Sequence, residues 1–520
     1  MSTKIKVGVF SPNDPRPWVR KENLDLMLEH EASLINALKR KGIKVVRGGD
    51  GFPQEDQIAW NTQLVMKQIE NIAKEKPDVL LINEGSWTFP YDSIDAVKYY
   101  MKETDDIARV IIFSYKDTEV PGLVAGMAAG GGLKRIGIPF STCYGIIDKD
   151  PFTLDTLIAL ISFYKRRADV SGQVKEAIRK LGRQKYLALG GMSLKMATTT
   201  TDVDQWQKLF GISYEALDQS VIIDKALQMV EWIGKPGESE YTIKDKRVEE
   251  AMNYIVGKNH GDFDFSRDKL KSLHKFVLQM SLYYAVLDLF KEYGITFGGI
   301  KCQDELSANY CTACIATAFL NNDVGPDGRS KDIYPVACEN DMDSSLTQLW
   351  LYLLSGRPAG FGDFRDVEDG KLAIVNCGQH PPYFFGDIKD DSVKRLNNVE
   401  YMGQEIFYDA GGSSVRGRTP GGQIMTVARL GRENLRYYLV ATIIETVDVS
   451  KSKHKKYNYS WPIILGKISI PDETLINIWP CNHLGFTYGD YTPHLAEMAH
   501  RLDIGFRIYD ATGREYYKAS

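Results

Sequence analysis

The sequence predicts an α/β fold with two doubly wound α/β domains followed by a mainly-β C-terminal domain. In the first 150 residues, short apolar runs alternate with helical segments, which is the pattern of a doubly wound parallel sheet. A second alternation of this kind continues to about residue 366. From residue 367 onward the chain is rich in short β-like runs. We therefore expect domains at residues 1–150, 151–366 and 367–520.

The N-terminal domain is expected to alternate four strands with four helices. The expected strands are Lys4–Phe10, Lys44–Val46, Val79–Ile82 and Val110–Phe113. The expected helices are Glu22–Lys41, Gln57–Glu75, Asp92–Lys102 and Leu123–Gly131. The glycine run at 130–132 lacks the strand-then-helix setting of a dinucleotide fingerprint, so we interpret it as a helix end.

The remaining elements follow in order along the chain. A helical segment, Phe152–Ile178, leads to the second α/β domain, which begins with the strand Lys185–Leu189 and includes the long helix Arg267–Tyr293. The β-like runs of the third domain are Leu372–Asn376, Tyr401–Tyr408, Gln423–Ala428, Tyr437–Thr446 and Ile463–Ile470.

Two acidic residues, Glu339 and Asp363, are the leading functional candidates. An apolar run before Glu339 predicts a strand, residues 344–354 predict a helix that Gly356 and Pro358 end, and a second short run leads to Asp363. Successive parallel strands usually lie side by side, so both acids would share the carboxyl edge of one sheet, where ligands bind. Paired carboxylates there suit a divalent metal, acid–base work or both; the alternative is that both acids end strands on a solvated rim.

Two histidines in loops could add ligands to these carboxylates. His483 follows a strand-like stretch, Leu475–Ile478, and stands between Asn482 and an apolar-glycine turn. His380 lies in a loop after the strand Lys371–Val375. Either histidine could instead be structural. Two carboxylates with one or two imidazoles suit Mn²⁺, Mg²⁺ or Co²⁺ better than a metal that prefers thiolates.

Composition is that of a soluble enzyme. The chain has 520 residues and a formal net charge of −4, which gives no reason to expect nucleic-acid or membrane binding. No apolar run approaches the ~20 residues needed to span a bilayer, and the start lacks a signal-peptide core, so we expect a cytoplasmic protein. Seven cysteines spread thinly argue against a disulfide framework. We interpret Cys311 and Cys314, in an expected helix at 309–320, as buried thiols rather than a metal or redox site.

The chain resembles the L-fucose isomerase family of aldose–ketose isomerases over nearly its whole length. The family has a Glu and an Asp at the same 24-residue spacing, here Glu339 and Asp363, and a late Asn-His before a glycine turn, here Asn482 and His483. Further segments match in the same order: Tyr186–Met196, Trp206–Gly211, Gly412–Ser414 and Met425–Arg429. The chain departs from the family pattern at the Gln-rich strand, which appears here as Gly299–Glu305, and in the sugar-contacting loops. The resemblance implies a homo-oligomer, a trimer or hexamer, with shared active sites.

The resemblance also implies the chemistry. Glu339, Asp363 and His483 would ligate a divalent metal, expected to be Mn²⁺ with Co²⁺ or Mg²⁺ as alternatives. The metal would polarise the carbonyl of an aldose, and the two acids would move a proton between C2 and C1 through a cis-enediol. Which acid takes the first proton stays open, and a metal-driven hydride shift is the rival mechanism.

Six residues are candidate substrate contacts: Arg16, Arg20, Trp87, Gln303, His380 and Asn482. Arg16 and Arg20 resemble an early basic loop that in family members can enter a neighbouring subunit's site, and Trp87 is a candidate for stacking on the sugar. The alternatives are that the two arginines are ordinary surface charges and that Trp87 is part of the core.

Three classes of function follow. The first is a metal-dependent isomerase of a neutral sugar such as L-fucose or D-arabinose. The second is the same chemistry on an anionic sugar, sulfoquinovose, for which Lys301, Arg365, Arg416 and Arg418 are available. The third is a non-catalytic sugar-binding protein, which the intact set of Glu339, Asp363 and His483 disfavours.

Overall fold

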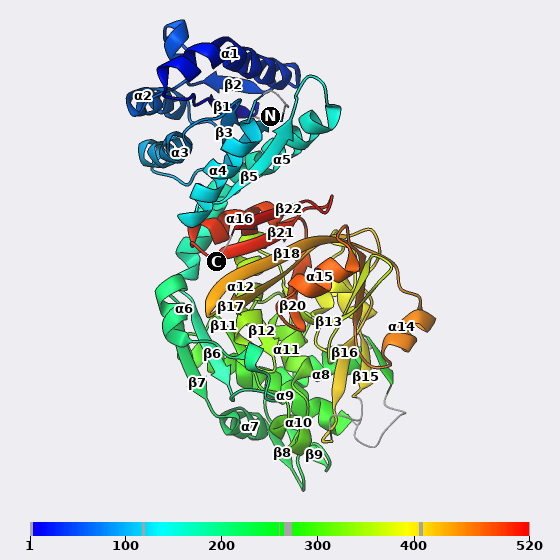
Figure 1. The fold of residues 1–520 in the computed structure, drawn as a ribbon. Coiled ribbons are helices and arrows are strands. Elements are labelled where there is room, and N and C mark those ends of the chain that lie inside the picture. Colours follow the sequence, from blue (N-terminus) through cyan, green and yellow to red (C-terminus); the bar gives the residue numbers. More distant parts are fainter. Residues whose placement is uncertain (1–3, 117–119, 259–260, 265–272, 405–408, 519–520) are drawn as a thin grey trace. The chain divides into compact units, whose positions relative to one another are not determined.

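The computed structural model describes residues 4–116, 120–258, 261–264, 273–404 and 409–518. The chain forms two units. Unit 1 comprises Met1–Gly172, Pro493–Arg507 and Tyr516–Ser520, and unit 2 comprises Gln173–Thr492 and Ile508–Glu515. Parallel sheets flanked by helices precede a mainly-β C-terminal sheet, so the predicted fold class is confirmed (Figure 1). The three domain bounds stay a prediction. No helix in the described ranges is long and apolar enough to cross a membrane.

Unit 1 is built on a five-stranded parallel sheet in the order β2-β1-β3-β4-β5. The strands are β1 (Lys6–Phe10), β2 (Lys44–Arg47), β3 (Val79–Glu84), β4 (Val110–Tyr115) and β5 (Phe140–Gly145). The helices are α1 (Pro17–Arg40), α2 (Thr62–Lys74), α3 (Pro90–Thr104), α4 (Gly122–Arg135) and the first part of α5 (Pro151–Leu181). The C-terminal helix α16 (Thr492–Arg501) returns to this unit, where its Glu497 pairs with the buried Arg109 and Arg167.

Two details of unit 1 differ from the sequence prediction. Strand β5 was not predicted, because its sequence Phe-Ser-Thr-Cys-Tyr-Gly carries few apolar residues. The glycines at 130–132 do not end a helix, since α4 continues to Arg135. A Cβ on Gly126 would lie 1.9 Å from the Ser114 hydroxyl, and one on Gly130 would lie 2.6 Å from the Phe140 ring. These glycines therefore let α4 lie close to the sheet.

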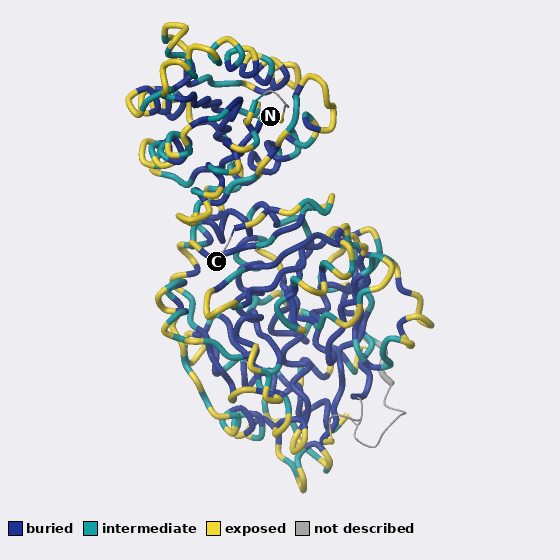
Figure 2. Tube along the Cα trace, viewed as in Figure 1, coloured by how far each residue is buried: buried dark blue, intermediate teal, exposed yellow. Residues whose placement is uncertain are grey.

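The first layer of unit 2 is a four-stranded parallel sheet in the order β12-β11-β6-β7. Its strands are β6 (Lys185–Leu189), β7 (Ser213–Leu217), β11 (Phe297–Ile300) and β12 (Val336–Cys338). The helices around it include α6 (Val203–Phe210), α7 (Gln219–Gln228), α9 (Leu273–Tyr293), α10 (Glu305–Asn309), α11 (Cys314–Leu320) and α12 (Met342–Ser355). Most of α9 is buried (Figure 2). The part of its predicted range before Leu273 lies outside the described residues.

The helix predicted over residues 309–320 is interrupted. Helix α10 ends at Asn309, α11 begins at Cys314, and the backbone between them is not helical. Cys311 and Cys314 are both free and buried, as predicted for packed thiols.

The second layer of unit 2 is an antiparallel sheet that closes on itself. The sheet has eight strands, of which six form the ring: β13 (Gly360–Glu368), β14 (Lys371–Val375), β17 (Ile424–Glu433), β18 (Arg436–Thr446), β19 (Ile463–Lys467) and β20 (His483–Tyr488). The other two are β21 (Gly505–Tyr509) and β22 (Glu515–Lys518), which follow β18 in the strand order. The six ring strands follow the order β17-β20-β13-β14-β19-β18, and pairing of β17 with β18 completes the ring. Closure pairs the strand edges that would otherwise be exposed. Buried side chains such as Ile374, Val427 and Phe486 form part of the barrel's hydrophobic core.

Three smaller strands lie in a separate sheet, β10 (Asp262–Asp264), β15 (Glu400–Gly403) and β16 (Ser413–Arg416). The predicted run Tyr401–Tyr408 corresponds to β15, which ends at Gly403, and residues 405–408 lie outside the described ranges. The stretch Leu475–Ile478, expected to be a strand, belongs to helix α15 (Asp472–Ile478). Pro471 before it and two acids in its first turn favour a helix start there.

The most consequential difference concerns β12 and β13. They are not neighbouring parallel strands, since β12 is in the parallel sheet and β13 pairs antiparallel with β14 and β20. The prediction that Glu339 and Asp363 share one sheet edge is therefore wrong. Short apolar runs show that strands exist but not which strands they pair with, and the 14-residue α12 connects two different sheets.

Helix α12 packs against both layers. On one side, the Ser345 hydroxyl donates to the Gly298 carbonyl of β11 (2.7 Å). On the other, the Thr347 hydroxyl accepts from the Leu430 amide of β17 (3.0 Å), and a Cβ on Gly485 of β20 would lie 3.0 Å from Thr347. The residues just before α12 are thereby held beside the barrel strands.

Candidate active site

Three side chains meet where α12 begins. The Nε2 atom of His483 lies 3.0 Å from Glu339 Oε2 and 3.5 Å from Asp363 Oδ1. His483 is almost fully buried, whereas the Asp363 side chain keeps 38% of its surface exposed. The cluster therefore joins a buried imidazole to a carboxylate that solvent or a ligand can reach.

The register of the barrel brings Asp363 and His483 together. They are directly opposite each other in the antiparallel pair of β13 and β20. Directly opposite residues project from the same face of a sheet, with Cβ atoms roughly 5 Å apart. The Asn482 amide donates to Asp363 Oδ1 (3.4 Å), so the residue before His483 also contacts this carboxylate.

Glu339 enters the cluster from a tight turn after β12. Glu339 and Asn340 both have left-handed backbone angles, with φ of 58° and 50°. Such angles cost non-glycine residues of order 1 kcal/mol each and persist where the surroundings enforce them. The side chain of Asn340 is held on both sides. Its Nδ2 atom donates to the Gly190 carbonyl (3.0 Å), and its Oδ1 atom accepts from the Tyr186 hydroxyl (2.8 Å). A Cβ on Gly299 would lie 2.5 Å from the Asn340 side chain, so only glycine leaves room for it.

Burial and charge shift the protonation of the cluster. Partial withdrawal of the Asp363 carboxylate from water, with a smaller contribution from the neighbouring Glu339, raises the pKa of Asp363 to about 7 despite the nearby imidazole. Burial by itself lowers the pKa of His483, but its hydrogen bonds with Asp341 and Glu339 outweigh that effect and hold the pKa well above the usual value.

A third carboxylate, Asp341, lies behind the imidazole. Its Oδ2 atom is 2.6 Å from His483 Nδ1, and Arg429 of β17 donates to both of its oxygens (2.9 and 3.2 Å). Burial raises the pKa of Asp341, but the charge of Arg429 and the contact with His483 prevail and hold it well below the usual range. Asp341 thus remains an anion in a fully buried position.

Comparison with known proteins identifies the family of the chain. The model of the L-fucose isomerase C-terminal domain matches residues 374–509, which contain His483 and Arg429, and that of the first N-terminal domain matches residues 4–171. The chain belongs to the L-fucose isomerase family. Similar relatives include the L-fucose isomerases of Bacteroides thetaiotaomicron, 22% identical over 99% of this chain and 95% of the relative, and of Haemophilus influenzae, 22% identical over 100% and 95%. Family membership makes the chain an aldose–ketose isomerase, an intramolecular oxidoreductase.

Three predicted substrate contacts of this isomerase lie in unit 2, and their environments differ. Asn482 touches Asp363, as described. His380 is fully buried with its ring 4.9 Å from Phe486, edge to face, and burial lowers its pKa to about 3, so it is a neutral histidine of the barrel core. Gln303 follows β11, and its backbone carbonyl accepts from the Ser193 hydroxyl (2.8 Å).

Of the three predicted contacts of unit 1, Arg16 and Trp87 lie on loops after two neighbouring strands, whereas Arg20, expected in the same loop as Arg16, lies in the first turn of helix α1. Arg16 precedes α1 and is paired with the buried Asp14 (2.6 Å), while half of its side chain is exposed. Arg20 lies over the Trp60 ring, with its guanidinium 3.8 Å from the ring centre. Trp87 follows β3. Since β1 and β3 are adjacent and parallel, these loops share the carboxyl edge of the sheet, at its topological switch point.

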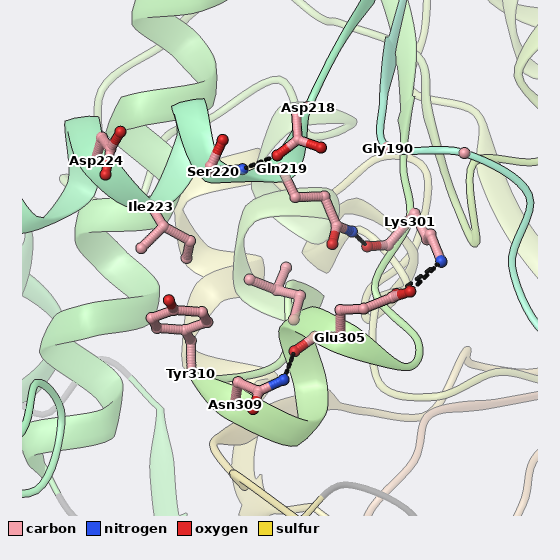
Figure 3. A pocket seen from close by; sticks show the side chains of 12 residues that line it. Gly190, Asp218, Gln219, Ser220, Ile223, Asp224, Lys301, Glu305, Asn309 and Tyr310 are labelled. Atoms are coloured by element: carbon pink, nitrogen blue, oxygen red, sulfur yellow. Dashed lines mark hydrogen bonds and ion pairs between the residues drawn. The ribbon is translucent and has the colours of Figure 1, made fainter.

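A cavity of about 420 Å³ opens at the carboxyl edge of the four-stranded sheet. It is lined by Gly190 after β6, Asp218 after β7 and Lys301 after β11, together with the first turn of α7 and α10. Figure 3 shows the Lys301 ammonium paired with Glu305 (2.7 Å). The edge is the one from which Glu339 emerges, because β12 pairs with β11.

No role was predicted for Asp341 or Arg429. Arg429 ends the family-like segment Met425–Arg429, and the available signal for Asp341 was its position as the capping residue of the helix after Glu339. Within the described ranges, no group of three or more His, Cys, Asp or Glu side chains forms a ready-made metal site. The donor chemistry of Glu339, Asp363 and His483 nevertheless fits a divalent cation: two carboxylates and one imidazole nitrogen.

Proposed function

We propose that the chain interconverts a neutral aldose of the L-fucose or D-arabinose type and its 2-ketose. The observation that carries the proposal is that His483 lies within 3.5 Å of both Glu339 and Asp363, at the positions where the sequence resembles the family's functional residues. Aldose–ketose isomerisation moves hydrogen between C1 and C2, which requires a group that takes a proton from one carbon and returns it to the other. Glu339 and Asp363 supply two carboxylates within reach of one imidazole.

We propose Glu339, Asp363 and His483 as the residues that hold a divalent metal, most simply Mn²⁺, with Co²⁺ or Mg²⁺ as alternatives. When bound, the metal polarises the substrate carbonyl and stabilises negative charge on the enediol oxygens. The two acids move the proton: one accepts it from C2 and a proton is returned to C1, which leaves the sugar's composition unchanged. The order in which the acids act is open, and a hydride shift is the rival route.

Around Lys301, the charges of the described residues favour a neutral sugar over an anionic one. That ammonium is already paired with Glu305, and Asp218 and Asp224 line the same cavity. These carboxylates would repel a sulfonate.

Sulfoquinovose stays a second candidate because of a different pair of cations. Arg416 and Arg418, two residues apart on the chain, both pair with the single carboxylate of Glu400. One carboxylate cannot neutralise two guanidinium groups, so an anionic group would be favoured near them. The backbone amide of Val415, the residue before Arg416, donates to the Gly378 carbonyl (2.8 Å). Gly378 lies in the loop after β14, and β14 pairs with β13, the strand that carries Asp363.

We further propose a cytoplasmic homo-oligomer, a trimer or hexamer, in which Arg16, Arg20 and Trp87 of one copy complete the site of another. The support is the family resemblance and the place of these residues on the carboxyl edge of the sheet in unit 1.

The test of the reaction is a panel of sugars with the full-length protein. L-fucose, D-arabinose and sulfoquinovose are supplied with Mn²⁺ after chelation, and ketose formation is read directly. Turnover of a neutral sugar supports the first candidate and turnover of sulfoquinovose alone supports the second. No ketose from any aldose, with Mn²⁺ shown to be bound, would contradict the isomerase proposal.

A further inference from the structure

Asp341 carries more contacts than its role as a helix cap requires. Its Oδ1 atom accepts the Ser344 amide (2.9 Å), which is the capping bond of α12. The two oxygens also accept from the Ser344 hydroxyl, from Arg429 and from His483 Nδ1. A helix cap needs only the first of these bonds, so the buried arginine and imidazole need another explanation.

The contact with His483 fixes the chemistry of the imidazole. An ionised carboxylate can only accept hydrogen bonds, so the 2.6 Å contact requires that Nδ1 carries a hydrogen. In the neutral ring, the lone pair is then on Nε2, the atom that faces Glu339 and Asp363. A histidine binds a metal through the nitrogen without hydrogen, and its other nitrogen usually donates to a carboxylate or carbonyl.

Arg429 fixes the position of Asp341 itself. Its two terminal nitrogens lie on the two carboxylate oxygens, and one of them also donates to the Thr198 carbonyl (3.2 Å). Asp341 precedes α12, Arg429 belongs to β17 and His483 to β20. The bonds therefore connect the helix that follows Glu339 to the barrel strand that carries His483. Both charged partners are almost completely buried, where an ion pair is held in one geometry.

We propose that Asp341, held by Arg429, is a positioning residue that sets the tautomer and orientation of His483, so that its Nε2 is available to a divalent cation between Glu339 and Asp363. The inference rests on the proposed metal dependence. It assigns Asp341 no contact with the substrate. A purely structural ion pair is the competing explanation.

A neighbouring pair provides the matched control. Asp343, two residues further along, is also buried, and it accepts from Arg432 of β17 (3.1 Å) and from the Tyr437 hydroxyl (2.7 Å). It joins the same helix to the same strand, but no contact connects it to His483 in the described part of the chain. Asp341→Asn and Asp343→Asn therefore remove similar buried charges, and only the first changes the partner of the imidazole.

The experiment measures binding of Mn²⁺ alone to the full-length protein by calorimetry, after chelation, with unfolding temperature recorded in parallel. Asp341→Asn keeps the capping oxygen but offers an amide N–H toward Nδ1, which favours the tautomer with hydrogen on Nε2. We expect Mn²⁺ affinity to fall about 10–100-fold, the loss typical of partners behind a metal-binding histidine. The Mn²⁺ affinity of Asp343→Asn should stay within about twofold of the wild-type value, even if its unfolding temperature falls as much as that of Asp341→Asn.

Each outcome has a defined meaning. Wild-type protein that binds no Mn²⁺ refutes the proposed metal dependence and leaves no metal for Asp341 to serve. Wild-type protein that binds Mn²⁺ while Asp341→Asn binds it equally well overturns the positioning role alone. An equal loss in both variants also overturns it, because a general loosening would then be the cause. If Asp341→Asn does not fold, Arg429→Lys decides: it retains the charge and loses the two-pronged contact, and an unchanged affinity would overturn the inference.

Discussion

Glu84 offers a prediction about stability that is independent of the isomerase site. It ends β3 and is fully buried, where it accepts hydrogen bonds from the hydroxyls of Ser93 (2.6 Å) and Thr88 (2.7 Å). No cation is paired with it among the described residues. Burial raises the pKa of its carboxyl to about 7, against an ordinary value of 4.5. The folded protein therefore binds this proton more tightly than the unfolded chain does.

The sign of the effect follows from linkage. The contribution of protonated Glu84 to the free energy of unfolding is fully present below the unfolded pKa of 4.5. It is lost as the pH rises through the folded pKa of about 7. A shift of about 2.5 units corresponds to about 3 kcal/mol at high pH, of which about 2.5 kcal/mol develops between pH 5 and pH 8. Glu84→Gln removes the ionisation, and a hydroxyl can turn to accept from the new amide. The variant should therefore gain stability relative to wild type as the pH rises.

The assay is hydrogen exchange of peptides from β3 at pH 5 and pH 8, corrected for the intrinsic pH dependence of exchange. Taking the difference between wild type and variant removes the contribution of Asp92, whose carboxyl lies nearby and has a pKa raised by burial to about 6. Glu103→Gln, an exposed position in α3, is the matched control and should follow wild type at both pH values. Parallel pH dependence of Glu84→Gln and wild type would refute the reasoning.

Three further predictions concern the proposed reaction. Glu339→Gln and Asp363→Asn should each lower kcat/KM for the sugar turned over by at least about 10²-fold, the lower bound for a positioned acid–base group, and near-normal turnover in either would show that the site is elsewhere. Exhaustive chelation should abolish turnover and Mn²⁺, Co²⁺ or Mg²⁺ should restore it, whereas full activity without metal by elemental analysis would contradict metal dependence. Mixed oligomers of Asp363→Asn and Arg16→Ala chains, reassembled after dissociation, should exceed either parent in activity if the Arg16 loop acts in another copy's site. An active monomer, or no recovery from well-mixed oligomers, would count against shared sites.

The parts of the fold that the sequence predicted are those governed by local pattern. In unit 1 the alternation of apolar strands and helices was sufficient to predict four of the five sheet strands, because β1, β3 and β4 are nearly continuous apolar runs. Strand β5 lacks that signal, and its neighbours in the sheet compensate for its weak propensity. Helix α12 was predicted over residues 344–354, nearly to its ends, because Gly356 stops it in the left-handed region.

The structure brings together the two acids that the sequence singled out, but by a different route from the one predicted. Spacing singled out Glu339 and Asp363 on the assumption of two adjacent parallel strands, yet the structure brings them together through His483, which is opposite Asp363 across β13 and β20. The partner of a strand is decided by contacts distant in sequence, which a window of 24 residues does not contain. The same limit applies to Arg429, which ends the family-like segment Met425–Arg429 but was given no role, because its partner Asp341 is 88 residues away in sequence. In the structure this ion pair connects the start of the helix after Glu339 to the barrel.

This arrangement has a consequence for how the site tolerates change. Glu339 follows a strand of the parallel sheet, while Asp363 and His483 are carried by barrel strands, so their relative position depends on how α12 packs between the two layers. Side chains at that packing contact, such as Thr347 against Gly485, can therefore displace one carboxylate from the other without touching either. Misplacement of reacting groups by about 1 Å can cost of order 10²-fold in rate. The geometry of the site is thus a property of the interface between two sheets, and the left-handed turn at Glu339 and Asn340 is the strained element that this interface holds in place.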